Sequence, residues 1–214
     1  MKQNLTEIIF ILDKSGSMSG LEKDTIGGFN SLIEKQKKEQ GEALISTVLF
    51  SDSSKVIHNR ININDIPLLT SNEYYVSGCT ALLDALGNSI NYIIKKHKEI
   101  NIDEVPEKTL FVITTDGYEN ASKEYTYSKI KSMIKDVKEK YNWEFIFLGA
   151  NIDAVREASK FGIDEENAVN YNCDTVGVEI NYKCLDEAIS SVRINKCLSK
   201  MWRESIDNDV KSRK

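Results

Sequence analysis

Two aspartates that follow apolar runs are the side chains of this sequence best placed to do chemistry. Asp13 ends one apolar run, and Asp116 ends a second run much later in the chain. Ser15 and Ser17 follow the first aspartate, and Thr80 lies where a helical pattern begins. Carboxylate and hydroxyl oxygens are hard donors, which suit Mg²⁺, Mn²⁺ or Ca²⁺ rather than zinc or copper. We therefore predict a divalent-metal site formed by Asp13, Ser15, Ser17, Thr80 and Asp116.

The charges of the two aspartates also favour a bound cation. If the strands that end at Asp13 and Asp116 are neighbours, the two carboxylates repel and raise each other's pKa. A divalent ion would remove this repulsion, with some ligands acting through water. Taken singly, Ser15, Ser17 or Thr80 could instead cap a helix, and Asp116 could belong to a turn. Their arrangement along the chain favours one shared site.

Apolar runs that alternate with helical patterns indicate how the chain would position these residues. Runs rich in β-branched and aromatic residues predict strands buried on both faces, at 8–12, 43–50, 109–115, 143–150 and 168–171. Apolar residues at helical spacing predict helices between them, at 21–40, 81–94, 127–141 and 153–161. The loosely alternating segment 55–61 follows a short turn, which predicts a hairpin and one antiparallel edge strand.

This alternation predicts an α/β fold: a doubly wound, mostly parallel, Rossmann-like sheet with one antiparallel edge strand and helices on both faces. In such sheets ligands bind beyond the carboxyl ends of the strands, where both aspartates lie. The chain contains no repeat and no composition break, so we expect one domain over 1–214. Within it, 180–210 is expected to form a C-terminal helix and 211–214 a frayed tail.

Composition and charge argue against several classes of protein. The chain is 41% apolar and 29% charged, which is ordinary for a globular protein. Its net charge of −5 argues against nucleic-acid binding. No segment approaches the roughly 18 apolar residues of a membrane span. The first residues contain no export signal, so we expect a cytoplasmic protein whose four cysteines are free thiols.

The motifs of the predicted site carry a family resemblance. The segment 13–17 reads Asp-Lys-Ser-Gly-Ser, 78–80 reads Gly-Cys-Thr, and 115–117 reads Thr-Asp-Gly. Their order, spacing and strand context resemble the metal-ion-dependent adhesion site (MIDAS) of von Willebrand factor A (VWA) domains. The resemblance extends over nearly the whole chain, and the triple match is far more specific than the first motif alone.

The resemblance implies a non-catalytic protein-binding module. In this family Ser15, Ser17 and Thr80 would bind the ion directly or nearly so, while Asp13 and Asp116 would act partly through water. A carboxylate from an Asp or Glu of a partner protein would complete the ion's shell, and the last helix could shift on occupancy. The missing export signal places the chain nearer the intracellular bacterial members, which often work with ATPases or in stress-response complexes.

The alternative hypothesis is that the chain is a Mg²⁺-dependent phosphotransfer enzyme of the haloacid-dehalogenase type, with Asp13 as nucleophile. That chemistry needs a second carboxylate two residues later as general acid or base, and Ser15 occupies that position. No phosphate-binding Gly-x-x-x-x-Gly-Lys-[Ser/Thr] loop occurs, and neither histidine lies near a motif. Tyr118 and Met18, beside the predicted ligands, are candidates to line a partner surface.

Overall fold

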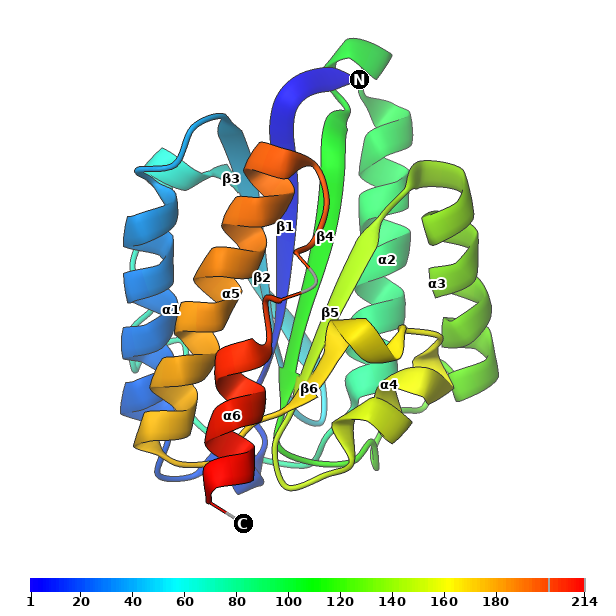
Figure 1. The fold of residues 1–214 in the computed structure, drawn as a ribbon. Coiled ribbons are helices and arrows are strands. Elements are labelled where there is room, and N and C mark those ends of the chain that lie inside the picture. The colour runs from blue at the N-terminus through cyan, green and yellow to red at the C-terminus, as the bar shows by residue number, and fades with distance from the viewer. Residues whose placement is uncertain (200, 214) are drawn as a thin grey trace.

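The computed structural model of the chain describes residues 1–199 and 201–213, and it contains a six-stranded sheet with the strand order β3-β2-β1-β4-β5-β6 (Figure 1). The strands are β1 (Lys2–Asp13), β2 (Glu42–Phe50), β3 (Ser54–Asn62), β4 (Pro106–Thr115), β5 (Glu144–Gly149) and β6 (Ala168–Asn170). Strand β3 pairs antiparallel with β2, and every other pairing is parallel. The predicted fold class, including its antiparallel edge strand, is confirmed.

Helices cover both faces of the sheet. They are α1 (Glu22–Gln36), α2 (Leu82–Glu99), α3 (Tyr127–Tyr141), α4 (Ala154–Phe161), α5 (Thr175–Asn195) and α6 (Glu204–Ser212). One apolar core lies between the sheet and α1, α5 and α6, and a second lies between the sheet and α2, α3 and α4. Because both faces are covered, the central strands are apolar on both sides. No helix of the described residues is long and apolar enough to cross a membrane.

The strand order places the ends of β1 and β4 at the point where the chain changes direction. From β1 the chain moves outward to β2 and β3, and from β4 it moves the other way to β5 and β6. Neighbouring strands pair in register through Leu12 and Thr114, so their last residues lie side by side. The crevice at this switch point is where open α/β sheets bind ligands.

The C-terminal region differs from the predicted single helix over 180–210. Helix α5 begins at Thr175 and ends at Asn195, because Lys196 adopts a left-handed conformation with φ of 63°. Helix α6 begins only at Glu204. The buried Trp202 anchors the connection, since its indole N–H donates to the carbonyl of Glu166 at 3.0 Å.

The predicted frayed tail over 211–214 is also wrong for its described part. Helix α6 continues to Ser212. Arg213 then forms ion pairs with Asp174 at 2.5 Å and with Asp209 at 2.7 Å. Lys214 lies outside the described residues. The end of α6 is therefore fastened to the start of α5.

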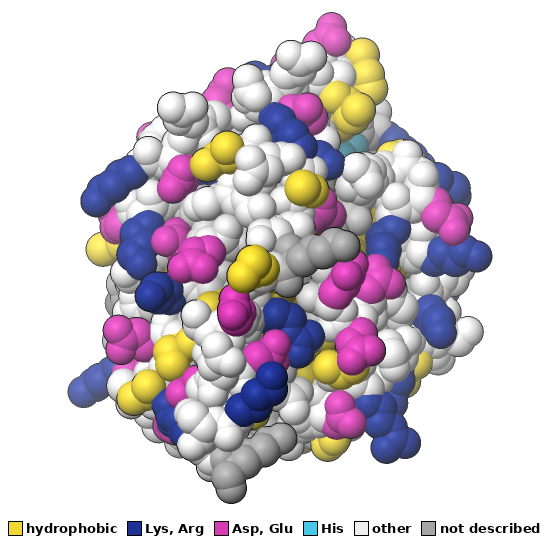
Figure 2. Space-filling view, viewed as in Figure 1, with side chains coloured by type: hydrophobic (Ala, Val, Ile, Leu, Met, Phe, Trp, Pro, Cys, Tyr) yellow, Lys and Arg dark blue, Asp and Glu magenta, His cyan; other side chains and the backbone are white. Residues whose placement is uncertain are grey.

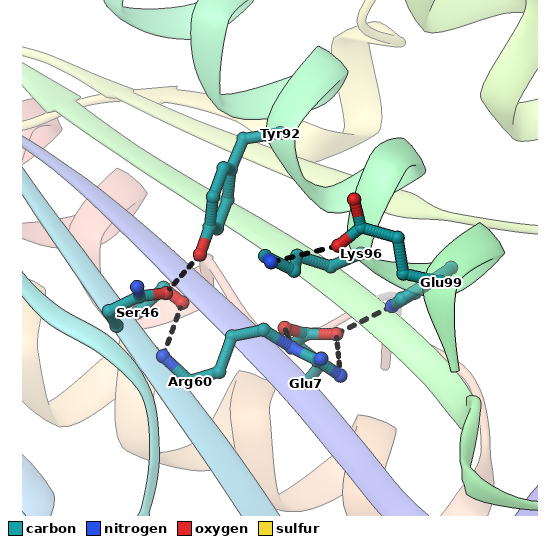
Figure 3. A network of polar contacts seen from close by, with 8 residues as sticks. Glu7, Ser46, Arg60, Tyr92, Lys96 and Glu99 are labelled. Atoms are coloured by element: carbon teal, nitrogen blue, oxygen red, sulfur yellow. Dashed lines mark hydrogen bonds and ion pairs between the residues drawn. The ribbon is translucent and has the colours of Figure 1, made fainter. Parts of the chain in front are cut away.

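A buried network of hydrogen bonds surrounds Glu7, in the first half of β1 (Figure 3). The carboxylate of Glu7, which has no exposed surface, accepts a hydrogen bond from Arg60 Nε of β3 at 2.7 Å. His97 Nε2 of α2 lies 2.6 Å from the other carboxylate oxygen. The Ser46 hydroxyl accepts the backbone N–H of Arg60 at 3.1 Å. This network ties the edge strand and α2 to the central strand.

The surface over α5 and α6 shows no field of a single charge (Figure 2). Lysine and arginine side chains alternate with aspartate and glutamate across this face, and apolar side chains appear singly or in small groups. A surface of this kind offers no extended charged or apolar patch for a ligand. The candidate ligands lie instead at the ends of the strands.

Candidate metal centre

Asp13, the last residue of β1, forms the buried floor of the candidate site. Its side chain is only 1% exposed. One carboxylate oxygen accepts the backbone N–H of Ser15 at 2.7 Å, and the other accepts the hydroxyl of Thr115 at 2.6 Å. Tyr74 holds the backbone of Asp13 itself, because its hydroxyl donates to the Asp13 carbonyl at 2.6 Å. The first predicted ligand is thus held in one orientation by three groups.

The two serines connect this floor to the second aspartate. The hydroxyls of Ser15 and Ser17 lie 3.1 Å apart, and the Ser17 hydroxyl donates to Asp116 Oδ1 at 2.6 Å. Ser15 is 1% exposed, whereas Ser17 is exposed to solvent. The short 3-10 helix Gly16–Met18 places both hydroxyls on the same side. The cluster therefore opens to solvent at Ser17.

Asp116 follows β4 directly and is 3% exposed. Its Oδ2 atom is buried and has no hydrogen-bond partner among the described residues. Burial of a carboxylate oxygen without a donor is unfavourable, and such an atom requires an explanation. A cation held beside Oδ2 would supply the missing interaction.

Thr80 reaches the same cluster from the loop before α2. Its side chain is 3% exposed. A Cβ atom added to Gly117 would lie 3.4 Å from the Thr80 hydroxyl oxygen and 3.6 Å from that of Ser17. Both hydroxyls therefore border the space above Gly117, which the absent side chain leaves open. All five predicted residues thus gather at the ends of β1 and β4 and on the loop before α2.

Hydrogen bonds between loops hold this arrangement. The Gly16 N–H donates to the Gly78 carbonyl at 3.0 Å, which joins the first motif to the second. Gly78 has φ of 76°, and a Cβ there would lie 2.0 Å from an Asp52 carboxylate oxygen. Asn120 accepts the N–H of Thr80 at 2.9 Å and donates its own N–H to the Thr80 carbonyl at 3.0 Å. The second and third motifs are thereby joined as well.

Two of these supporting residues were not predicted from the sequence, and a third, Thr115, belongs to a predicted motif but was not predicted to bind Asp13. Tyr74 and Asn120 act through contacts that no local pattern reveals. Thr115 could have been found, because it precedes Asp116 and the parallel register places it beside Asp13. In contrast, Met18 is a wrong prediction for a partner surface, since it is 2% exposed and packs in the core.

The electrostatics of the cluster favour a bound cation. Burial raises the pKa of Asp13 above its ordinary value, and the nearby Asp116 carboxylate adds to this rise. Hydrogen bonds from Thr115 and Ser15 partly oppose it. Burial likewise raises the pKa of Asp116, partly offset by the Ser17 hydroxyl. Within the described part of the chain, no lysine, arginine or histidine forms an ion pair with either carboxylate.

The donor set therefore fits a divalent cation. Two carboxylates without an ion-pair partner among the described residues, and three hydroxyls, supply only oxygen ligands, which Mg²⁺, Mn²⁺ and Ca²⁺ prefer. Among the described residues no group of three or more His, Cys, Asp or Glu side chains is placed to hold a metal ion, so an ion at this site would need the hydroxyl oxygens as ligands. An ion here would neutralise both aspartates and satisfy the orphaned oxygen of Asp116.

Comparison with known proteins gives the same fold. No protein-family model matches the chain, and no curated protein matches it. Among solved structures, proximal thread matrix protein 1 from the mussel byssus matches with a TM-score of 0.59 and 14% identity, over 87% of this chain and 46% of that chain. A von Willebrand factor type A structure from Catenulispora acidiphila matches with a TM-score of 0.56 and 13% identity, over 87% and 42%.

These matches identify the chain as having the fold of a von Willebrand factor A domain. This chain spans less than half the length of both solved structures. Another structure of the mussel protein contains a zinc-occupied MIDAS motif, and it matches with a TM-score of 0.59 and 15% identity, over 86% of this chain and 46% of that chain. At such low sequence identities the matches establish the fold alone, and the activity has to be inferred from the residues of the site.

Proposed function

We propose that this chain is a metal-dependent protein-binding module. Asp13, Ser15, Ser17, Thr80 and Asp116 hold one divalent ion, for which Mg²⁺ is the expected physiological choice and Mn²⁺ or Ca²⁺ the alternatives. The observation that carries the proposal is the buried Oδ2 atom of Asp116, which has no hydrogen-bond partner among the described residues. It lies near Asp13, a second buried carboxylate with which no cationic side chain of those residues forms an ion pair. A cation accounts for both.

The opening at Ser17 supports a binding role for the ion. Mg²⁺ usually keeps several waters, and a carboxylate from a partner's Asp or Glu can displace one of them. Such a partner would be bound only while the ion is present. A partner within an ATPase or stress-response complex of the cytoplasm fits the resemblance described above. The net charge of −5 keeps nucleic acid an unfavourable partner.

We also propose that the site is non-catalytic. Phosphotransfer through Asp13 needs a general acid or base two residues later, and that residue is Ser15, whose hydroxyl contacts Ser17. A serine hydroxyl cannot replace a carboxyl group as the general acid or base of this reaction. We expect no Mg²⁺-dependent phosphatase turnover. Sustained hydrolysis of a phosphate ester that Asp13→Asn abolishes would overturn this part of the proposal.

Acetate provides a minimal test, because it is the smallest carboxylate that can complete the ion's shell. With ¹⁵N-labelled protein and Mg²⁺, acetate should shift the amide signals of Ser15, Ser17 and Gly117. Without Mg²⁺, or in Thr80→Val, the same titration should leave these signals in place. Shifts that do not depend on the ion, or no shifts with it, would contradict the proposal.

A further inference from the structure

Two exposed tyrosines lie beside the candidate metal centre, on loops that carry its ligands. Tyr75 is 57% exposed and lies shortly before Thr80. Tyr118 is 50% exposed and lies two residues after Asp116. Large aromatic side chains with half of their surface in solvent are the usual anchors of protein interfaces. What sets these two rings apart from other exposed side chains is their place on the loops that carry the candidate ligands.

Each ring is held in place. The Lys14 ammonium lies 4.5 Å from the centre of the Tyr75 ring. The Tyr118 hydroxyl accepts the backbone N–H of Asp153 at 3.3 Å, and the Lys160 ammonium lies 5.8 Å from its ring centre. A tyrosine held by such contacts loses little conformational entropy when a partner packs on it. The two rings are thus preorganised for contact with a partner.

The rings are tied to loops that follow different strands of the sheet. Tyr75 leans on Lys14, which belongs to the loop after β1. Tyr118 is bonded to Asp153, which follows β5, on the far side of β4. Ser17 and the open space above Gly117 belong to the loops after β1 and β4, which lie between β2 and β5 in the sheet. A partner whose carboxylate reaches the ion would therefore approach the loops that hold both rings.

The charges near the rings select an acidic partner. Lys160 is neutralised by Glu157 at 2.6 Å. Lys14 is 9% exposed, and in the part of the chain that the structure describes no carboxylate forms an ion pair with it. Its ammonium, which lies against the exposed Tyr75 ring, is therefore available to pair with an acidic group of a partner. A partner with a second carboxylate would supply this group.

We infer that Tyr75, Tyr118 and Lys14 form a specificity rim around the ion. The rim takes an acidic segment of a partner protein, in which a metal-binding Asp or Glu is flanked by aromatic or large apolar side chains and by a second acidic residue. The inference rests on the proposed function, since the ion must anchor the first carboxylate. The rim then decides which carboxylate-bearing segments are held.

A random peptide library displayed against the immobilised chain tests the rim. Peptides are bound in Mg²⁺, released with EDTA and sequenced. We expect an acidic residue with aromatic or large apolar neighbours, enriched about fivefold over the input, as one or two aromatic contacts would give. Tyr75→Ala and Tyr118→Ala should remove the aromatic preference, and Lys14→Met the preference for a second acidic residue.

Tyr141 provides the matched control, because it is 46% exposed at the end of α3, next to Trp143 rather than the metal centre. Tyr141→Ala should leave the selected sequences unchanged. Acidic peptides without any preference at the flanking positions would overturn the rim and leave the proposed function intact. Peptides without acidic residues, or no release by EDTA, would overturn both. Mn²⁺ binding to each variant shows whether a lost preference arises from a lost ion.

Discussion

Strand β1 carries two buried carboxylates, Glu7 and Asp13, and their surroundings differ in one respect. Glu7 is fully buried and is matched by the Arg60 guanidinium and by His97 (Figure 3). Asp13 is 1% exposed and accepts hydrogen bonds from Thr115 and Ser15, and among the described residues no cationic side chain forms an ion pair with it. The charge of Glu7 is balanced by a side chain of the protein, whereas the charge of Asp13 would have to be balanced by a bound cation.

This difference separates a structural charge from a functional one. A buried carboxylate that is paired with a cationic side chain contributes to the specificity of the fold and does not need a metal ion. A buried carboxylate that has oriented donors but no cation is costly, and a second one nearby adds repulsion. Asp13 and Asp116 are such a pair, and they lie at the switch point of the sheet. The comparison predicts opposite responses to mutation in the two regions.

Removal of Arg60 should give the largest effect. Arg60→Ala leaves the charge of Glu7 buried with only His97 beside it, and loss of one partner of a buried pair costs about 3–5 kcal/mol. Urea unfolding measures this loss. The double variant Glu7→Met with Arg60→Leu is the control, because removal of both charges should restore most of the stability. A loss below about 1 kcal/mol in Arg60→Ala would mean that Glu7 is not balanced as described.

The second prediction concerns the metal centre. Mg²⁺ at about 100 times its dissociation constant should stabilise the chain by about 2.7 kcal/mol. Asp116→Asn should abolish this gain, yet the metal-free variant should be no less stable than the metal-free parent, because the charge that repels Asp13 is gone. Thermal unfolding with Mg²⁺ and with EDTA gives both values. A metal-free variant that is clearly destabilised would contradict the view that the pair is uncompensated.

A smaller effect is expected for Thr115, which donates to Asp13 at 2.6 Å. Thr115→Val keeps the shape of the side chain and removes the donor that orients the carboxylate. Loss of such an outer contact typically weakens metal binding about tenfold, which is about 1.4 kcal/mol. Isothermal titration with Mn²⁺ checks this value. Thr109→Val, at a buried threonine of β4 far from the cluster, should leave Mn²⁺ affinity unchanged.

The smallest effect concerns pH. The pKa values of Asp13 and Asp116 are raised in the folded chain without metal, so the folded state holds protons more tightly than the unfolded state. Their contribution to stability is therefore present below the ordinary carboxyl pKa and declines as pH rises through the raised values. With Mg²⁺ the trend should reverse, because the ion binds the deprotonated carboxylates. Unfolding free energies with and without Mg²⁺ across this range, compared with Asp116→Asn, test the sign.

The sequence was sufficient to predict the fold class and where the five candidate ligands lie. Buried strands appear as apolar runs, and an acidic residue directly after such a run is placed at the end of a strand. The start of β1 was less visible, because Glu7 interrupts the apolar pattern and is accommodated only through Arg60 and His97. Those partners lie far away along the chain, so the pairing arises from the tertiary structure.

The C-terminal region shows the same limit. The apolar stripe of α5 and that of the later segment are offset, which is compatible with either a bent helix or two helices. The break at Lys196 and the bond from Trp202 to Glu166 decide between them. The roles of Tyr74 and Asn120 are not predictable from the sequence for a related reason, since each residue binds a motif that is distant along the chain. Contacts between loops determine how firmly the site is held.

The most direct test of the central claim is the stoichiometry of Mn²⁺ binding, measured by electron paramagnetic resonance or calorimetry. We predict one ion per chain in the parent protein and none in Asp13→Asn or Asp116→Asn. Glu7→Gln removes the other buried carboxylate of β1 and should keep the ion, provided the variant remains folded by circular dichroism. Absence of binding in the parent, or equal binding in Asp116→Asn, would contradict the account.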